Sequence, residues 1–320
     1  MAAEEEARAK LRVGSLGSRL KKDWKSIRQQ FSSYGILLVL SIIWGTAFVA
    51  IRIADFELSP INLTLLRWFV SCAGFLVIAL FIGKPKTKLE RQDLPRLLLL
   101  SLLNVPFYHL ALNFAEKTVS SGLAGFMSSL NPIFAAVFSA YFLKEKIGKR
   151  LALALTLGIM GAMVLALPNR SFGSEESIVG LLELLVVSLS FAGFSVLSKP
   201  LIHKYGSAPV TIWAGLTGTI MLLPLLSPSF VTEATALSST GWFAVLFLAI
   251  LSTVAGYLMF YTLVSRGAVS RLSIQLYLIP VISVIAGVLL LQESLSVYTI
   301  IGGAILLFSI ALATMQKKKG

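Results

Sequence analysis

The stretch NPIFAAVFSAYFLKEKIGKR, residues 131–150, occurs again in altered form as PVISVIAGVLLLQES, residues 280–294. Each copy is an apolar run that has a proline near its start and a glutamate at its end. Glu145 corresponds to Glu293 at an offset of 148 residues, and the two prolines share that offset. A repeat that spans about half the chain indicates a duplicated protein rather than a short-period solenoid.

The composition indicates the environment of the duplicated halves. Hydrophobic residues make up 56% of the chain and charged residues 13%, whereas about 25% of residues are charged in a typical soluble domain. Apolar runs of about 20 residues recur along the whole chain, and each is long enough to cross a bilayer. The sequence therefore predicts an all-α polytopic membrane protein.

The apolar runs divide the chain into two sets of five predicted transmembrane helices. The ten helices are expected at roughly 35–53, 60–82, 94–114, 119–142, 149–167, 178–198, 208–227, 241–264, 268–291 and 297–315. The predicted regions are a basic cytoplasmic N-terminal tail at 1–34, a first five-helix repeat at 35–167, an outer linker at 168–177, a second five-helix repeat at 178–315 and a basic cytoplasmic tail at 316–320. Because five is odd, the second repeat enters the membrane in the opposite sense, as in the inverted repeats of many secondary transporters.

Basic residues in the short loops predict the orientation. With the N-terminus inside, 24 Lys and Arg residues fall in inside segments, and only Lys117 and Arg170 fall in outside segments. Both termini are therefore predicted to be cytoplasmic. The same distribution explains the net charge of +13 without a nucleic-acid partner. The tail is either a cytoplasmic, partly disordered segment or, over residues 16–31, a basic surface helix that binds anionic lipid.

The residue types needed for most enzymatic sites are scarce. The chain has one cysteine, Cys72, and two histidines, His109 and His203. These are too few for an intramolecular disulfide or a cysteine-based metal site. The sequence contains no HExxH, DDxxD, GxSxG or GxxxxGK[ST] motif. We therefore predict no enzymatic activity, no metal and no cofactor.

Several short motifs, in order and in tandem, carry a family resemblance. They are Trp44-Gly45 with Arg52, Leu66-Arg67-Trp68, Pro132 through Leu143-Lys144-Glu145, Pro280 through Leu291-Gln292-Glu293, and Gly302-Gly303. With these motifs the chain resembles the drug/metabolite transporter superfamily, in particular its EamA-like family. The resemblance implies ten helices in two inverted halves around a central cavity, with alternating access and transport of a small metabolite.

Polar and aromatic side chains inside the predicted spans form the candidate substrate site. An ionisable group in hydrocarbon needs a partner or water, and aromatic rings with polar tips suit a cavity for amphipathic solutes. The candidates are Trp44, Arg67, His109, Asn113, Phe191, Tyr257, Tyr261, Gln275 and Tyr277. Structural alternatives remain: a paired or snorkelling Arg67, an interhelical hydrogen bond at His109, and a helix-packing role for the face that holds Trp44 and Phe191.

Two further features concern the transport cycle. Pro132 and Pro280 are predicted hinges, since a proline within a helix removes a backbone hydrogen bond and favours a kink; kinked packing without gating is the alternative. Glu183 is either a proton-coupling carboxylate or an interfacial acid.

The expected function is secondary transport of an amino acid, nucleobase or similar solute, in the export direction, across the cell membrane. The alternatives are a nucleotide-sugar or sugar-phosphate antiporter, for which Arg67, Lys199, Arg266 and Arg271 are the candidate cations, and a non-transporting receptor or scaffold. The expected partners are the small-molecule substrate and the bilayer, and the oligomeric state is a monomer or a homodimer.

Overall fold

The chain is all-helical throughout the part that the structure describes. The computed structural model describes residues 33–81, 88–131, 134, 137–138, 149–166, 175–266, 269–294 and 296–314. Within them, six helices are long and apolar enough to cross a membrane: Ser33–Asp55, Pro60–Phe81, Arg91–Thr118, Ile178–Tyr205, Ser207–Leu225 and Ser239–Ser265. Shorter apolar helical segments lie at Ala152–Gly161, Leu278–Leu291 and Val297–Leu312.

The first part of the chain folds into helices that are interrupted once by a π-helical segment. After the first helix come α2 (Pro60–Phe81), η1 (Arg91–Asp93), α3 (Leu94–Leu102), η2 (Leu103–Phe107), α4 (Tyr108–Thr118), α5 (Ser121–Met127), η3 (Ser128–Leu130) and α7 (Lys149–Ala166). The η2 segment contains Pro106, which has no backbone N–H to donate, and the helix widens there into a π turn. Thus α3, η2 and α4 form one continuous rod.

The second part repeats this pattern with one additional short helix. Its elements are α8 (Glu175–Tyr205), α9 (Ser207–Leu222), η4 (Leu223–Leu225), α10 (Pro228–Ala236), α11 (Ser239–Leu246), η5 (Phe247–Ala255), α12 (Gly256–Ser265), α13 (Val269–Leu291) and α14 (Val297–Thr314). The short helix α10, which the sequence analysis did not predict, begins with Pro228, a residue that suits the first helical position. The η5 segment is again π-helical and joins α11 to α12.

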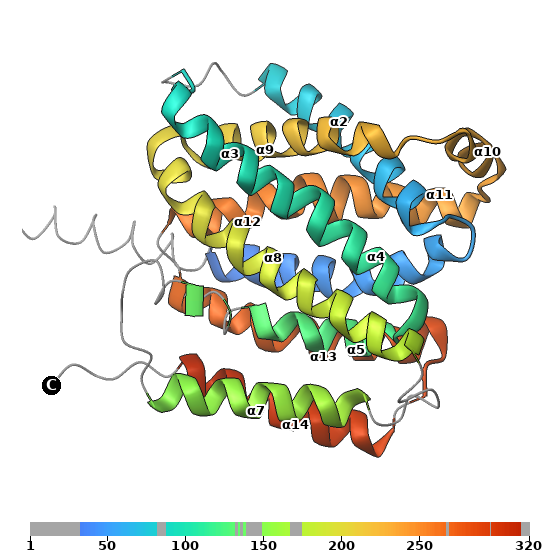
Figure 1. The fold of residues 1–320 in the computed structure, drawn as a ribbon, viewed down its shortest axis with the longest axis vertical. Coiled ribbons are helices and arrows are strands. Elements are labelled where there is room, and N and C mark those ends of the chain that lie inside the picture. Colours follow the sequence, from blue (N-terminus) through green and yellow to red (C-terminus); the bar gives the residue numbers. More distant parts are fainter. Residues whose placement is uncertain are drawn as a thin grey trace, which may run out of the picture.

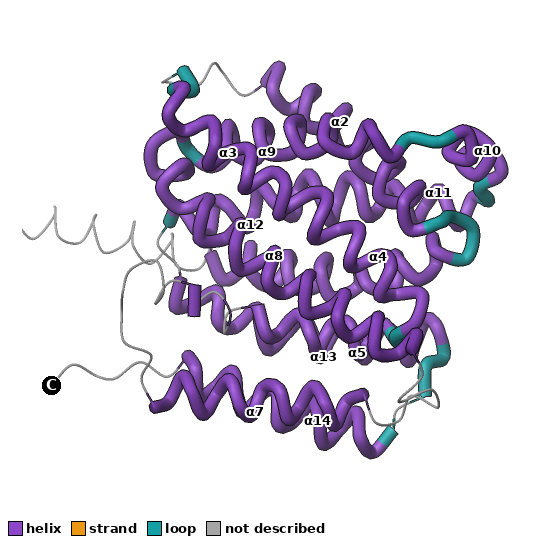
Figure 2. The backbone as a smooth tube through the Cα atoms, viewed as in Figure 1, coloured by secondary structure: helices purple, strands orange, loops and turns teal. Residues whose placement is uncertain are grey.

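The helices lie side by side with their ends at two opposite sides of the molecule (Figure 1). Helix α7 packs against α14, α5 against α13, and α2 against α9, while α4 packs against α8. The loops gather at the two ends of the bundle, so the long helices run from one end to the other (Figure 2).

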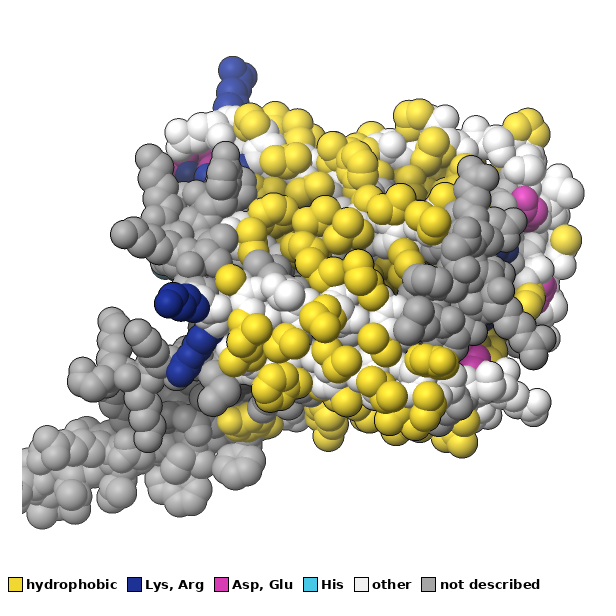
Figure 3. Space-filling model, turned by 60° about the horizontal axis from the view of Figure 1, so that its bottom comes forward, with side chains coloured by type: hydrophobic (Ala, Val, Ile, Leu, Met, Phe, Trp, Pro, Cys, Tyr) yellow, Lys and Arg dark blue, Asp and Glu magenta, His cyan; other side chains and the backbone are white. Residues whose placement is uncertain are grey.

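The surface matches an orientation across a bilayer. Figure 3 shows a broad apolar face, with most of the visible Lys and Arg side chains at one end and most of the visible Asp and Glu side chains at the other. Large apolar side chains on the surface of the molecule are largely exposed, such as Phe81 at 84% and Leu289 at 73%. In water such a surface is an unfavourable patch, but in hydrocarbon it is the expected one.

A candidate substrate site around Arg67

Arg67 lies inside the bundle, where an unpaired charge is costly. It is the eighth residue of α2, about 10 Å along the helix at 1.5 Å per residue, and only 3% of the side chain's surface is exposed. Its Nε donates to Thr253 Oγ1 at 2.9 Å, and Nη2 donates to Ser252 Oγ at 3.3 Å. Nη1 has no hydrogen-bond partner among the described residues. The guanidinium is thus held by two hydroxyls and keeps one donor group free.

The π-helical segment η5 positions both hydroxyls. Thr253 Oγ1 donates to the carbonyl of Leu248, five residues earlier, at 2.8 Å. The carbonyl of Ser252 accepts a hydrogen bond from Trp44 Nε1 at 3.0 Å. Gly256 allows this close approach, because a Cβ there would lie 2.5 Å from Trp44 Nε1. A π segment of this kind frees backbone groups for other partners and is frequent at functional sites.

Aromatic rings from five helices form a cluster near the arginine. Trp44 of the first helix lies 6.2 Å from Phe191 of α8, 5.9 Å from Tyr257 and 5.5 Å from Phe260 of α12, measured between ring centroids. Further members of this aromatic cluster are Trp68, Tyr108, Phe194 and Tyr261. Trp44, Tyr108 and Phe191 are only half-buried, whereas Trp68 and Tyr261 are fully buried.

His109 connects the arginine to the aromatic cluster. Its Nε2 lies 3.3 Å from the hydroxyl of Tyr257, and its ring lies 5.1 Å from that of Trp68. Both His109 and Tyr257 are within electrostatic range of the Arg67 guanidinium. His109 Nδ1 and the hydroxyl of Tyr261 have no hydrogen-bond partner in the described part of the chain. Several buried polar atoms in this region therefore have no hydrogen-bond partner among the described residues.

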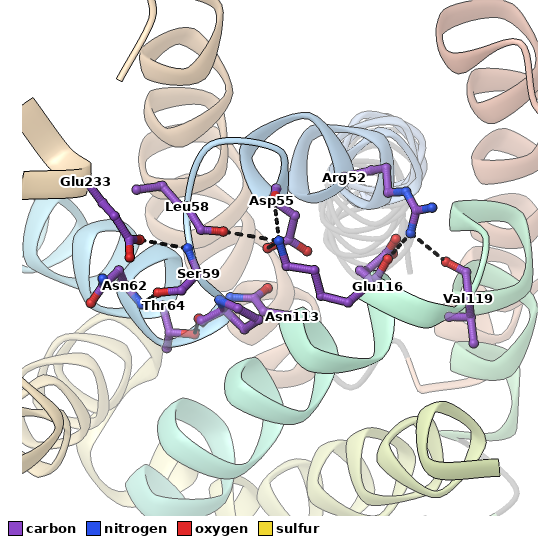
Figure 4. A network of polar contacts seen from close by, with 12 residues as sticks. Arg52, Asp55, Leu58, Ser59, Asn62, Thr64, Asn113, Glu116, Val119 and Glu233 are labelled. Atoms are coloured by element: carbon purple, nitrogen blue, oxygen red, sulfur yellow. Dashed lines mark hydrogen bonds and ion pairs between the residues drawn. The ribbon is translucent and has the colours of Figure 1, made fainter. Parts of the chain in front are cut away.

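The structure brings together six of the nine predicted substrate residues, namely Trp44, Arg67, His109, Phe191, Tyr257 and Tyr261. Asn113 lies elsewhere, in a polar network nearer one end of the bundle, where its amide donates to Thr64 Oγ1 at 2.8 Å (Figure 4). The side chains of Gln275 and Tyr277, and the whole of Pro132, fall outside the described residues. Pro280 is buried within α13.

Sequence reasoning missed other members of the site. Trp68, Tyr108, Phe194 and Phe260 join the aromatic cluster, and Ser252 holds the guanidinium. The position of Trp68 next to Arg67 was a usable signal. Ser252 was harder to find, because the π register that brings it to Arg67 leaves no clear pattern in the sequence.

The face of the first helix that was predicted to line a cavity or to pack against other helices has residues of two kinds. Trp44 and Phe191 belong to the aromatic cluster, as a cavity role requires. Gly45, by contrast, is a packing residue, because a Cβ there would lie 2.6 Å from Ile282 Cγ2 of α13. The aromatic cluster and the packing contact with α13 therefore use neighbouring residues of one helix face.

This arrangement defines a class of protein. A buried guanidinium whose Nη1 has no partner among the described residues is chemically suited to a carboxylate. The described residues contain no group of His, Cys, Asp and Glu side chains that is able to hold a metal ion. The molecule is a multi-pass integral membrane protein with a buried arginine inside its helix bundle.

The chain belongs to the EamA-like transporter family. The model of this family matches residues 32–167 and, separately, residues 178–315. These two matches cover nearly all of the chain between its polar ends.

Similar proteins are described as transporters. An uncharacterized transporter of Archaeoglobus fulgidus is 33% identical over 283 residues, which cover 88% of this chain and 99% of that protein. A protein of Streptantibioticus cattleyicolor, named a "probable terminal-alkyne amino-acid exporter", is 26% identical over 84% of this chain and 89% of its own length. One crystal structure shares the fold with a TM-score of 0.60 and 20% identity, over 88% of this chain and 96% of that chain.

Proposed function

We propose that the protein is a secondary transporter that exports small carboxylate-bearing solutes, such as amino acids, across the cell membrane by alternating access. The observation that carries this proposal is Arg67, which is buried among aromatic rings while its Nη1 lacks a partner among the described residues. A solute carboxylate supplies the missing acceptor, and an apolar side chain on the solute packs against the rings.

The proposed architecture is ten transmembrane helices in two inverted five-helix halves, with both termini in the cytoplasm. The two separate matches of the family model support a duplication. Further support comes from the packing, because helices that correspond in the two halves lie against each other: α2 with α9, α5 with α13, and α7 with α14. The basic end of the bundle then faces the cytoplasm, as the positive-inside rule expects.

A carboxylate suits the site better than a sugar phosphate does. A phosphate group in a cavity usually requires several cationic side chains. Lys199 is exposed near the end of α8, and Arg266 lies at the end of α12, 3.3 Å from Ser33 Oγ. The Arg271 side chain lies outside the described residues. Arg67 is thus the cation that the described residues place among the aromatic rings, and the named amino-acid exporter among the relatives points the same way.

Transport by purified protein in proteoliposomes tests the proposal. The panel contains amino acids, nucleobases and sugar phosphates, and each acid is paired with its amide, for example L-phenylalanine with L-phenylalaninamide. We expect saturable uptake of at least one amino acid, with the acid preferred over its amide. Sugar-phosphate exchange without amino-acid transport would support the antiporter alternative, and the absence of any transport would refute the proposal.

A further inference from the structure

Five charged side chains converge near the end of the bundle where the first helix ends. Arg52 and Asp55 are in the last turn of the first helix, Glu116 and Lys117 are at the end of α4, and Glu293 follows α13. Figure 4 shows Arg52, Asp55 and Glu116 directed toward one region between these helices. Asp55 is 5% exposed and Glu116 is completely buried. Two carboxylates are thus enclosed at the same place.

The two cations of this cluster donate their hydrogen bonds mainly to backbone carbonyl groups. Arg52 Nη1 donates to the carbonyls of Glu116 and, at 3.1 Å, Val119. Lys117 Nζ donates to the carbonyls of Asp55 and, at 3.2 Å, Leu58. Carbonyl groups at helix ends have no partner within their helix, so cations are favourable there. These hydrogen bonds to carbonyl groups explain why the two cations lie here. They do not require that the cations bind the carboxylates.

The carboxylates consequently lack donors. Neither oxygen of Asp55 has a hydrogen-bond partner among the described residues, and Oε1 of Glu116 has none either. The nearest cation to Asp55 is Lys117, whose Nζ is 3.9 Å from Oδ1. Glu116 Oε2 is 3.5 Å from Ser121 Oγ, a long hydrogen bond. A buried carboxylate normally accepts several hydrogen bonds, so both groups have fewer hydrogen-bond donors than usual.

The charge count gives an independent indication of the missing ligand. Three carboxylates face two cations, which leaves one surplus negative charge. Glu293 is satisfied, because its oxygens accept from the N–H groups of Ser121 at 3.0 Å and Gly122 at 3.4 Å, at the positive end of α5. Asp55 and Glu116 therefore remain as the carboxylates of the cluster whose oxygens lack hydrogen-bond partners among the described residues. One bound monovalent cation, or one proton, makes the cluster neutral.

We propose that Asp55 and Glu116 form a proton-binding site that couples export to the proton gradient. One proton from water on the outer side forms an O–H bond on one of the two carboxyl groups, and the same bond breaks when the proton is released to water on the inner side. The proposal rests on the proposed transport function, and it makes the protein a solute/proton antiporter. A proton fits better than a metal ion, since the described residues offer no cluster of side chains able to hold one.

Both carboxyl groups are on helices that also carry residues of the Arg67 site. The helix that ends at Asp55 carries Trp44, 11 residues earlier, and α4 starts with Tyr108 and His109. The other charged groups that act on the pair are Arg52 and Lys117 from the same two helices and Glu293 from the opposite half. A change of charge at Asp55 or Glu116 therefore acts on the first helix and α4, which carry residues of the proposed substrate site. It also acts on the contact of these helices with the second half.

A first experiment detects the proton without any substrate. The full-length protein is placed in lipid nanodiscs, and infrared difference spectra are recorded across a pH titration. We expect a carbonyl band of a protonated carboxyl group that is lost in Asp55→Asn or Glu116→Gln and retained in Glu183→Gln. Loss of the band in Glu183→Gln alone, or a band that neither of the first two variants affects, would overturn the assignment.

A second experiment tests coupling with L-phenylalanine as the probe. An acidic lumen should accelerate its uptake into proteoliposomes, because one coupled proton supports about a tenfold solute ratio per pH unit. Asp55→Asn and Glu116→Gln should lose this acceleration but keep exchange of L-phenylalanine across the membrane. A sodium gradient that replaces the proton gradient, or equal loss of exchange in well-folded variants, would overturn the proposal. If wild-type protein moves no solute of the panel at all, the transport function fails, while the infrared result still decides whether the proton site exists.

Discussion

Two arginines inside the predicted spans, Arg67 and Arg52, use their donors in different ways. Arg67 is held by the hydroxyls of Ser252 and Thr253 and has a donor group without a partner among the described residues. Arg52 donates to the backbone carbonyls of Glu116 and Val119. The carbonyl acceptors of Arg52 are part of the fold and cannot be exchanged. The incompletely satisfied guanidinium of Arg67 is the one suited to a ligand that comes and goes.

The largest expected effect comes from Arg67→Met. Removing one partner of a buried charge pair costs about 2–5 kcal/mol, so the apparent affinity for a carboxylate solute should fall by roughly 30-fold or more. The preference for L-phenylalanine over its amide should disappear in the same variant. Uptake kinetics with both solutes in proteoliposomes measure this change.

The melting temperature of Arg67→Met distinguishes a ligand-binding role of Arg67 from a structural role. Replacing a buried charge by an apolar side chain of similar length is often neutral or stabilising, so the melting temperature in detergent should stay constant or rise. A substantial fall in melting temperature with unchanged solute affinity would show that Arg67 is a structural residue.

Arg52→Met should give the opposite result. Hydrogen bonds to a charged group contribute about 1.5–3 kcal/mol each, and two helix-end carbonyls lose theirs in this variant. We expect a melting temperature several degrees lower, while L-phenylalanine still stabilises the protein that remains folded. If Arg52→Met and Arg67→Met lowered stability equally, the distinction between the two arginines would be wrong.

The sequence predicted the helical membrane fold well, because composition and apolar length alone determine which segments can enter hydrocarbon. It also predicted that Arg67, His109, Trp44 and Tyr257 are close together, since polar and aromatic side chains in spans turn toward the bundle interior. The partners of Arg67 were not predictable in the same way. They depend on the π register of η5, which shifts Ser252 and Thr253 relative to a regular helix.

The charged cluster escaped prediction for a related reason. In the sequence, Asp55, Glu116 and Glu293 are acids at or near the ends of predicted helices, where a side chain looks exposed. The burial of Asp55 and Glu116 arises only when the ends of the first helix and α4 meet. Glu183, the acid that the sequence analysis did consider for proton coupling, lies on α8 and is only partly buried.

An intermediate effect is expected for Trp44→Phe. The variant keeps an aromatic ring but removes the Nε1 donor, which leaves the Ser252 carbonyl without its 3.0 Å hydrogen bond. The loss of such a bond costs about 1–3 kcal/mol when the acceptor remains buried. Solute affinity and melting temperature should both fall, but affinity should fall less than in Arg67→Met. Trp242→Phe is the matched control, because Trp242 lies on α11 with 36% of its surface exposed, and it should leave both quantities unchanged.

The smallest effect concerns Glu57, an exposed acid in the turn after the first helix. Its carboxylate accepts hydrogen bonds from the hydroxyl and the backbone N–H of Ser238, both at 2.6 Å, at the start of α11. These hydrogen bonds, that of the hydroxyl first, lower the pKa of Glu57 below its ordinary value. Its contribution to stability is therefore complete above the ordinary pKa of Glu and is lost as the pH falls through the lowered pKa.

Melting curves of wild type and Glu57→Gln, recorded from about pH 7 down to pH 4, measure this contribution. The wild type should be slightly more stable at pH 7, and the difference should shrink as the pH falls. Ser238→Ala removes the hydroxyl donor, so adding Glu57→Gln to it should have less effect than adding Glu57→Gln to the wild type. Because both groups are exposed, water competes for their hydrogen bonds and keeps the effect small. If Glu57→Gln lowered the melting temperature as much as Arg52→Met does, exposure to water would not be what makes the Glu57 hydrogen bonds weak.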